Sequence, residues 1–196
     1  MKNNQNGSSM VEMLGVLGIV AMLSVGTLSL FSGIMDKYRI SATNNQIQTI
    51  TKKVQQLYVA QNTFKDLNTK VLLDENIIPS EMIVKNQTGF AKNKLGGKVT
   101  VNAAVDNGKD SKSFYIWFAG LSKSACLAIA KLNPDPNGRL NLVEIKVGAS
   151  NAGQTAFSGA PGIYTAAQVA AGTVNLGNLA TYCSHKTNNA IQWEFY

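Results

Sequence analysis

A single carboxylate, Glu12, lies near the start of the most apolar part of the chain. From Met13 to Met35 the sequence carries no charged residue. A charge in the middle of a membrane segment costs on the order of 3 kcal/mol on insertion scales. Glu12 therefore either lies at an aqueous interface or meets a cationic partner, because an ammonium group buried beside a carboxylate offsets much of that cost.

Two cysteines, Cys126 and Cys183, are the other residues with covalent chemistry. They belong to no CxxC motif, and the only histidine of the chain, His185, comes shortly after the second of them. Because a structural zinc site normally uses four well-spaced ligands, we expect no metal here. The cysteines form either two buried thiols or one disulfide, and export of the chain would favour the disulfide. Such a bridge would stabilise the fold by about 4 kcal/mol through the chain entropy that it removes.

The sequence holds no constellation of residues for catalysis. An acyl-transfer site needs a nucleophile next to a base, and His185 lies in a polar stretch that we expect to be a solvent-exposed loop. The chain contains no P-loop and no GxSxG motif. Three aspartates stand alone in loop-like segments and form no calcium loop, namely Asp106, Asp110 and Asp135. We expect no enzyme activity, no catalytic residues and no cofactor.

The charge balance favours an ordinary solvated surface. The chain has 196 residues and a formal net charge of +7, which suits one medium domain with a tail. Its lysines are scattered, and nowhere do five basic residues follow one another. Because a nucleic-acid site normally shows a clustered basic patch, we expect no specific nucleic acid partner.

The element that must position Glu12 is a long helix. Segment 10–35 is apolar apart from Glu12 and is long enough to cross a bilayer as a helix, which takes about 20 residues. An ordinary secretory signal has a shorter apolar stretch with a cleavage site after it, whereas here a polar leader, residues 1–7, comes first. No proline interrupts residues 8–78, so we expect one helix over residues 8–62, roughly 80 Å long.

Beyond the apolar segment we expect the helix to be amphipathic. Two apolar rows recur at helical spacing with polar residues between them, one of Ile40, Ile47 and Val54 and one of Ile50 and Leu57. A stripe of this width normally packs against a core. We expect it to lie against a sheet formed by the rest of the chain.

We interpret residues 63–196 as a head of short strands and helices. Strands are expected at 99–103, 113–119, 142–147 and 190–196, and helices near 65–73 and at 122–132, 165–171 and 175–182. Ser122 is the expected N-cap of its helix, and residues 148–163 are an expected Gly/Ala/Ser-rich loop. The order of these elements predicts an α+β fold.

The N-terminus resembles the signature of type IV pilins and pseudopilins. That family has a short polar leader that ends in glycine, cleavage directly after it, and a glutamate at the fifth mature position. Cleavage after Gly7 would make Ser8 the first mature residue and Glu12 the fifth, and the run from Met13 to Val20 is similar to the family's following stretch. The first mature residue is Ser here, where the commonest pattern of the family has Phe.

The resemblance implies a processing step and an assembly. A prepilin peptidase would remove residues 1–7 from a precursor in the inner membrane of a Gram-negative bacterium. The family also offers N-methylation of the new Ser8 amine, which the Ser in place of Phe leaves open. In a filament, Glu12 of one subunit would neutralise the Ser8 amine of a neighbour. The implied partners are other copies of the chain, the peptidase, the membrane and the inner-membrane pilus assembly machinery, and the product is an extracellular pilus.

The rest of the chain resembles the type IVb branch of this family. The likeness comes from the order of elements, the placement of the cysteines and the stretch from Gly120 to Cys126. It implies a long N-terminal helix packed on an antiparallel-rich β-sheet, with a Cys126–Cys183 disulfide that bounds a D-region, residues 126–183. The implied function is a structural subunit of a type IVb-like pilus, used for adhesion or aggregation. The alternatives are a minor pilin, a type II secretion pseudopilin or a conjugative thin-pilus subunit.

Overall fold

The fold is that of a computed structural model, which describes residues 8–85, 89–104 and 111–196. Within the first helix it leaves the side chains of residues 8, 9, 11, 21–34 and 36 undescribed. The expected leader, residues 1–7, lies outside the described residues. The chain divides into two compact units, Met1–Tyr38 and Arg39–Tyr196.

Helix α1, Ser8–Leu57, runs through both units. It ends before residue 62, the expected limit, because the backbone leaves the helix after the N–H of Tyr58 donates to the carbonyl of Val54 at 3.1 Å. The ring of Tyr58 is buried and packs on Phe64, with ring centroids 5.3 Å apart. Burying this aromatic pair favours the turn over a further helical turn.

The apolar stripe of α1 packs as core in the second unit. Ile47, Ile50 and Val54 are fully buried in the main hydrophobic cluster, as the helical spacing predicted. Leu57 was also expected in the stripe, and that expectation was wrong, since its side chain is 38% exposed. Leu57 is the last helical residue, and the neighbouring Tyr58 turns into the core there instead.

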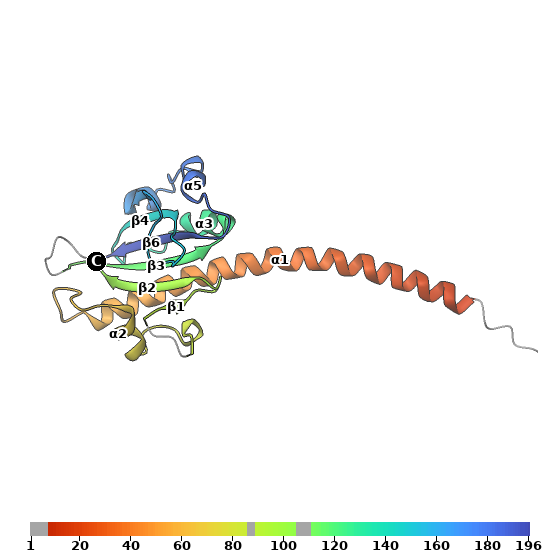
Figure 1. The fold of residues 1–196 in the computed structure, drawn as a ribbon, viewed down its shortest axis with the longest axis horizontal. Coiled ribbons are helices and arrows are strands. Elements are labelled where there is room, and N and C mark those ends of the chain that lie inside the picture. The colour runs from red at the N-terminus through yellow and green to blue at the C-terminus, as the bar shows by residue number, and fades with distance from the viewer. Residues whose placement is uncertain (1–7, 86–88, 105–110) are drawn as a thin grey trace, which may run out of the picture. The chain divides into compact units, whose positions relative to one another are not determined.

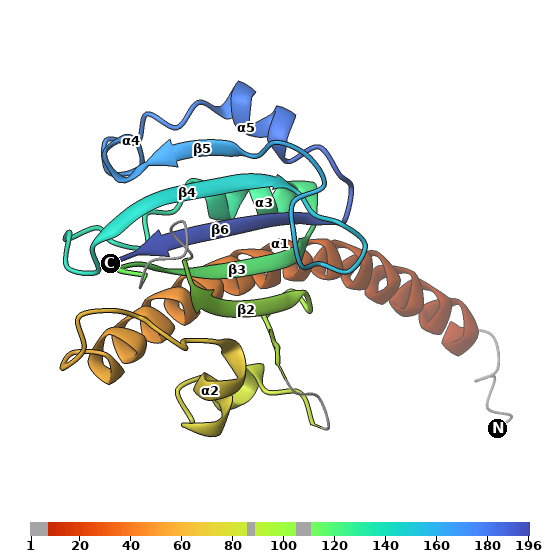
Figure 2. The same cartoon turned by 60° about the vertical axis from the view of Figure 1, so that its left-hand side comes forward.

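Within the described residues, six strands form one antiparallel sheet (Figure 1). The strands are β1 Ala91–Lys92, β2 Lys98–Ala103, β3 Phe114–Leu121, β4 Leu142–Ala149, β5 Gly162–Thr165 and β6 Asn189–Phe195, in the order β1-β2-β3-β6-β4-β5. The chain therefore closes with a strand that inserts between β3 and β4 (Figure 2). The expected α+β class, with a long helix on an antiparallel sheet, is confirmed.

Register across the three central strands separates the two faces of the sheet. Ile116, Trp193 and Ile145 lie opposite one another and are buried in the main core, on the face that α1 covers from Arg39 onward. Their chain neighbours point to the other face, because side chains alternate along a strand. Two of those neighbours, Gln192 and Lys146, are only half-buried.

Short helices complete the head, and side chains cap several of them. They are α2 Thr69–Asp74, the 3₁₀ helix Ser80–Met82, α3 Lys123–Ala130, α4 Ala166–Ala170 and α5 Leu176–Tyr182. Ser122 is the N-cap of α3, as expected, and its hydroxyl accepts from the N–H of Ala125 at 3.2 Å. A capping box formed by Thr165 and Gln168 begins α4.

Two strands were absent from the sequence-based expectation. The segment 148–163 was expected to be a loop, but β4 continues to Ala149 and β5 begins at Gly162. At Gly162 a side chain would overlap the ring of Tyr182, so glycine lets the α5 side chain pack directly on the edge strand. The two-residue strand β1 pairs with β2 and carries no pattern that periodicity would detect.

Candidate assembly surface and disulfide-bounded region

Glu12 lies on an N-terminal stretch of α1 whose described side chains are exposed. The carboxylate side chain is exposed, and so are the apolar residues around it. Seven of these apolar side chains are more than half exposed, namely Met10, Met13, Leu14, Val16, Leu17, Ile19 and Val20. A helix that is apolar on all sides is normally buried against other helices or lipid. This surface therefore needs a partner that removes it from water.

The predicted cleavage site is only partly described. Gly7 lies outside the described residues, and Ser8 is the first residue of α1, with an undescribed side chain. Ser8 and Glu12 are four residues apart on α1. The pairing of Glu12 with a neighbour's Ser8 amine stays a prediction.

The expected membrane-spanning segment, residues 10–35, is described in part. The side chains of residues 21–34, in the middle of this segment, are not described. Within the part of the chain that the structure describes, no helix is apolar over a length sufficient to cross a membrane.

Cys126 and Cys183 form a disulfide, which decides between the two alternatives that the sequence left open. Their Cα atoms are 5.9 Å apart, and both residues are fully buried. Cys126 lies within α3, and Cys183 is the C-cap of α5. The bond thus ties together the two ends of the expected D-region, residues 126–183, which contains β4, β5 and α4.

Two tyrosines pack within the disulfide-bounded segment, residues 126–183. Tyr164 of β5 is buried, and burial is the larger cause that raises the pKa of its hydroxyl, with the nearby Tyr182 as the second cause. The Tyr164 hydroxyl has no hydrogen-bond partner among the described residues. The ring of Tyr182 packs against Gly162, so α5 and β5 are held in direct contact.

The loop after β4 folds over the second face of the sheet, which sequence reasoning missed. The indole N–H of Trp117 donates to the carbonyl of Gln154 at 2.9 Å, and the N–H of Lys98 donates to the Gln154 side chain at 2.9 Å. Phe157 packs edge-on to Trp117, with centroids 4.6 Å apart. The only sequence signal for this anchor is an aromatic residue within a Gly/Ala/Ser-rich segment.

His185 and Asp135, which the sequence offered as candidates for chemistry, hydrogen-bond to backbone N–H groups. His185 is exposed, as expected, and its Nδ1 accepts from the N–H of Asn188 at 3.1 Å. Asp135 is buried in a turn, where its carboxylate accepts from the N–H of Leu142 at 3.4 Å. Asp106 and Asp110 lie outside the described residues. Among the described residues no group of three or more His, Cys, Asp or Glu side chains could hold a metal ion.

Comparison with known proteins identifies the family. The family described as PilS N terminal matches residues 37–195, which is most of the chain. The chain belongs to the PilS family of type IV pilins. As a class, these pilins are structural subunits and not enzymes.

Two curated proteins resemble this pilin over the same length. It is 26% identical to the major structural subunit of bundle-forming pilus of Escherichia coli O127:H6 (strain E2348/69 / EPEC) over 133 residues. The match covers 67% of this chain and 67% of that protein. The protein of the same name from Escherichia coli O111:H- matches to the same extent, at 26% identity over 133 residues.

Solved structures of two other pilins also resemble this pilin. One is TcpA, a type IV pilin from Vibrio cholerae El Tor biotype, with a TM-score of 0.49 and 14% identity over 80% of this chain and 98% of that chain. The other is a type IVb pilin from Salmonella typhi, with a TM-score of 0.46 and 14% identity over 78% of this chain and 97% of that chain.

Proposed function

We propose that this type IVb-like pilin is the structural subunit of a pilus and polymerises through α1 into an extracellular filament. The observation that carries the proposal is the exposed apolar surface around Glu12 in a chain of the PilS family. Each such side chain gains about 1.5–3 kcal/mol when it is fully buried. Packing of α1 segments from several copies would bury this surface.

Maturation precedes assembly in this proposal. The precursor is held in the inner membrane by segment 10–35, and a prepilin peptidase cuts between Gly7 and Ser8. The cut removes the polar leader and creates a free α-amino group at Ser8. The assembly machinery of the inner membrane then transfers the subunit to the base of the filament.

The new amine explains why an acid occupies position 12. Inside a bundle of apolar helices, an isolated carboxylate is strongly disfavoured, and so is an isolated ammonium. Placed together, each offsets the desolvation of the other, and the pair forms only when neighbouring helices have the correct axial offset. Glu12 of one subunit would thus meet Ser8 of the next and set the register.

Substitution of Glu12 tests the assembly step. Glu12→Ala is expected to leave leader removal and membrane insertion intact and to abolish most of the sheared filament, because the Ser8 amine would be buried without a counter-charge. The matched control is Asp36→Ala, which removes a carboxylate of the same helix outside the apolar segment. Filament yield of Glu12→Ala equal to that of the control would contradict the charge pair.

Substitution at the cleavage site tests maturation separately. Gly7→Ala is expected to leave the leader attached, because the peptidase of this family acts directly after glycine. The measurement is the intact mass of the membrane-extracted chain. A variant chain that still begins at Ser8 would show that the peptidase assignment is wrong.

A further inference from the structure

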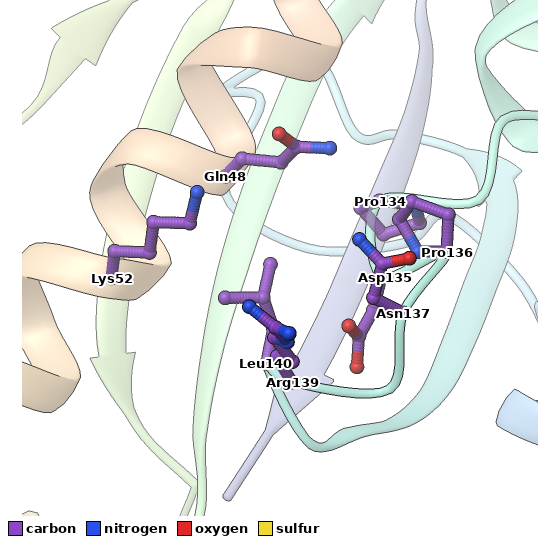
Figure 3. A pocket seen from close by; sticks show the side chains of 8 residues that line it. All are labelled: Gln48, Lys52, Pro134, Asp135, Pro136, Asn137, Arg139 and Leu140. Atoms are coloured by element: carbon purple, nitrogen blue, oxygen red, sulfur yellow. The ribbon is translucent and has the colours of Figure 1, made fainter.

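A groove runs between α1 and the loop that precedes β4 (Figure 3). It consists of two hollows of about 190 and 320 Å³ that share Lys52, Arg139 and Leu140 as lining residues. Gln48 also lines it from α1, opposite Asn137 of the loop (Figure 3). All of these residues belong to the second compact unit.

The walls of the groove are held by hydrogen bonds. The side-chain amide of Gln55 donates to the carbonyl of Leu140 at 2.8 Å and to a main-chain oxygen of Tyr196 at 2.7 Å. These bonds tie the loop and the last strand to α1. The position of the loop beside α1 is therefore fixed in part by these two hydrogen bonds.

The charge of the groove is not balanced within the head. Lys52 and Arg139 are exposed, and neither makes an ion pair with the described residues. The one carboxylate that lines the groove, Asp135, is buried and accepts from the backbone N–H of Leu142 at 3.4 Å. Two cations thus line the hollow without an ion-pair partner among the described residues, and an acidic group would complement them.

The head carries two exposed acidic residues in succession, Asp74 and Glu75. We call this pair the acidic corner. These residues end α2, and Asn76 then turns the chain with φ of +55°. Acids at a helix C-terminus oppose the helix dipole, and no basic residue lies in the last turn of α2 to relieve them. Asp74 meets only the exposed Lys70, at 3.0 Å, and Glu75 has no ion pair within the described residues.

The groove and the acidic corner lie on opposite flanks of the sheet. The N-terminus of α2 lies beside β2, where the Thr69 hydroxyl accepts from the N–H of Val101 at 2.8 Å. The loop of the groove leads into β4, and in the sheet β2 and β4 lie on either side of the β3–β6 pair (Figure 2). A contact between the two surfaces therefore joins different patches of two copies. Contacts of this heterologous kind repeat without closing when the rotation between copies is helical.

We propose that in the filament the acidic corner of one head docks into the basic groove of the next copy. Asp74 and Glu75 supply the carboxylates, and Lys52 and Arg139 receive them. This contact rests on the proposed polymerisation and adds to it a named pair of head surfaces. Its role is to select the neighbour and the rotation between heads, while α1 supplies the apolar burial.

Charge reversal tests the docking. Lys52→Glu with Arg139→Glu, and separately Asp74→Lys with Glu75→Lys, are each expected to lower the yield of sheared filament at least about tenfold, because attraction becomes repulsion at every interface. Combining the four substitutions is expected to restore most of the yield. Glu81→Lys and Lys131→Glu are matched single reversals outside the contact and are expected to leave the yield unchanged.

A crosslink keeps the test independent of how the reversed variants fold. In an otherwise natural chain, Glu75→Cys with Arg139→Cys is expected to give a ladder of disulfide-linked subunits in sheared filaments. Filaments without a ladder, together with no rescue by the fourfold variant, would overturn the docking and leave the proposed function standing. A natural chain that forms no filament at all would overturn both.

Discussion

Removal of the Cys126–Cys183 disulfide is the perturbation whose magnitude follows most directly from the structure. The two cysteines are separated by 57 residues along the chain. Cross-linking a loop of that length removes chain entropy worth about 4 kcal/mol from the unfolded state at 25 °C. Because whole domains are stable by about 5–15 kcal/mol, we expect the unbridged pilin to be folded but marginal.

Alanine is the appropriate replacement at both positions. Each cysteine is fully buried, so a serine hydroxyl there would add the separate cost of an unpaired polar group, about 1–3 kcal/mol. Cys126→Ala with Cys183→Ala is expected to lower the free energy of unfolding by about 4 kcal/mol from the lost bridge. The natural chain under a strong reductant supplies the control, because it loses the bond and keeps both sulfur atoms.

Urea unfolding of the full chain in detergent micelles measures this change. Trp117 and Trp193 are 3% and 1% exposed, so their fluorescence follows unfolding of the head. The reduced natural chain and the double variant are expected to unfold at similarly lowered urea concentrations. A loss below about 1 kcal/mol in both samples would refute the reasoning that the bridge acts by restricting the unfolded chain.

Three further substitutions test the packing of the head, each by the free energy of unfolding. Gly162→Ala is expected to destabilise by about 1–3 kcal/mol, because the new methyl group would overlap the Tyr182 ring, whereas Gly159→Ala, with open space around it, is expected to be neutral. Gln46→Met is expected to stabilise by about 1–3 kcal/mol, since the natural amide is 4% exposed and has no hydrogen-bond partner among the described residues; a loss of stability would contradict this. Ser122→Ala is expected to cost about 1 kcal/mol through loss of the α3 cap, and an unchanged value would show that the cap is redundant.

Sequence patterns predicted those helices and strands that are determined by their own residues. The aromatic run from Phe114 to Phe118 predicted β3, and Ser122 predicted the start of α3 by the chemistry of its hydroxyl. The heptad spacing of Ile47 and Val54 predicted the buried stripe of α1. In each case the residues that determine the element lie within it.

Elements determined by distant residues could not be predicted in the same way. The central place of β6 depends on its pairing with β3 and β4, and nothing within Asn189–Phe195 specifies that order. The end of α1 depends on Phe64, which receives the Tyr58 ring. The loop over Trp117 depends on the hydrogen bond from the Trp117 indole to the carbonyl of Gln154, which no periodicity reveals.

The candidate functional residues also differ in how far the sequence alone could predict them. Gly7, Ser8 and Glu12 follow from a contiguous motif, and their roles in cleavage and assembly stay predictions. The groove was not foreseen, because Lys52 and Arg139 belong to an amphipathic helix and a distant loop that only the fold brings together. Each of these residues by itself has the pattern of an ordinary surface cation.

The central claim is that this pilin is matured and then polymerised, and the intact mass of subunits from sheared surface filaments tests it most directly. We predict filaments whose subunit begins at Ser8, lacks residues 1–7 and is lighter by two hydrogen atoms because of the Cys126–Cys183 bond. A chain that retains residues 1–7, or one that never enters sheared filaments, would contradict the account.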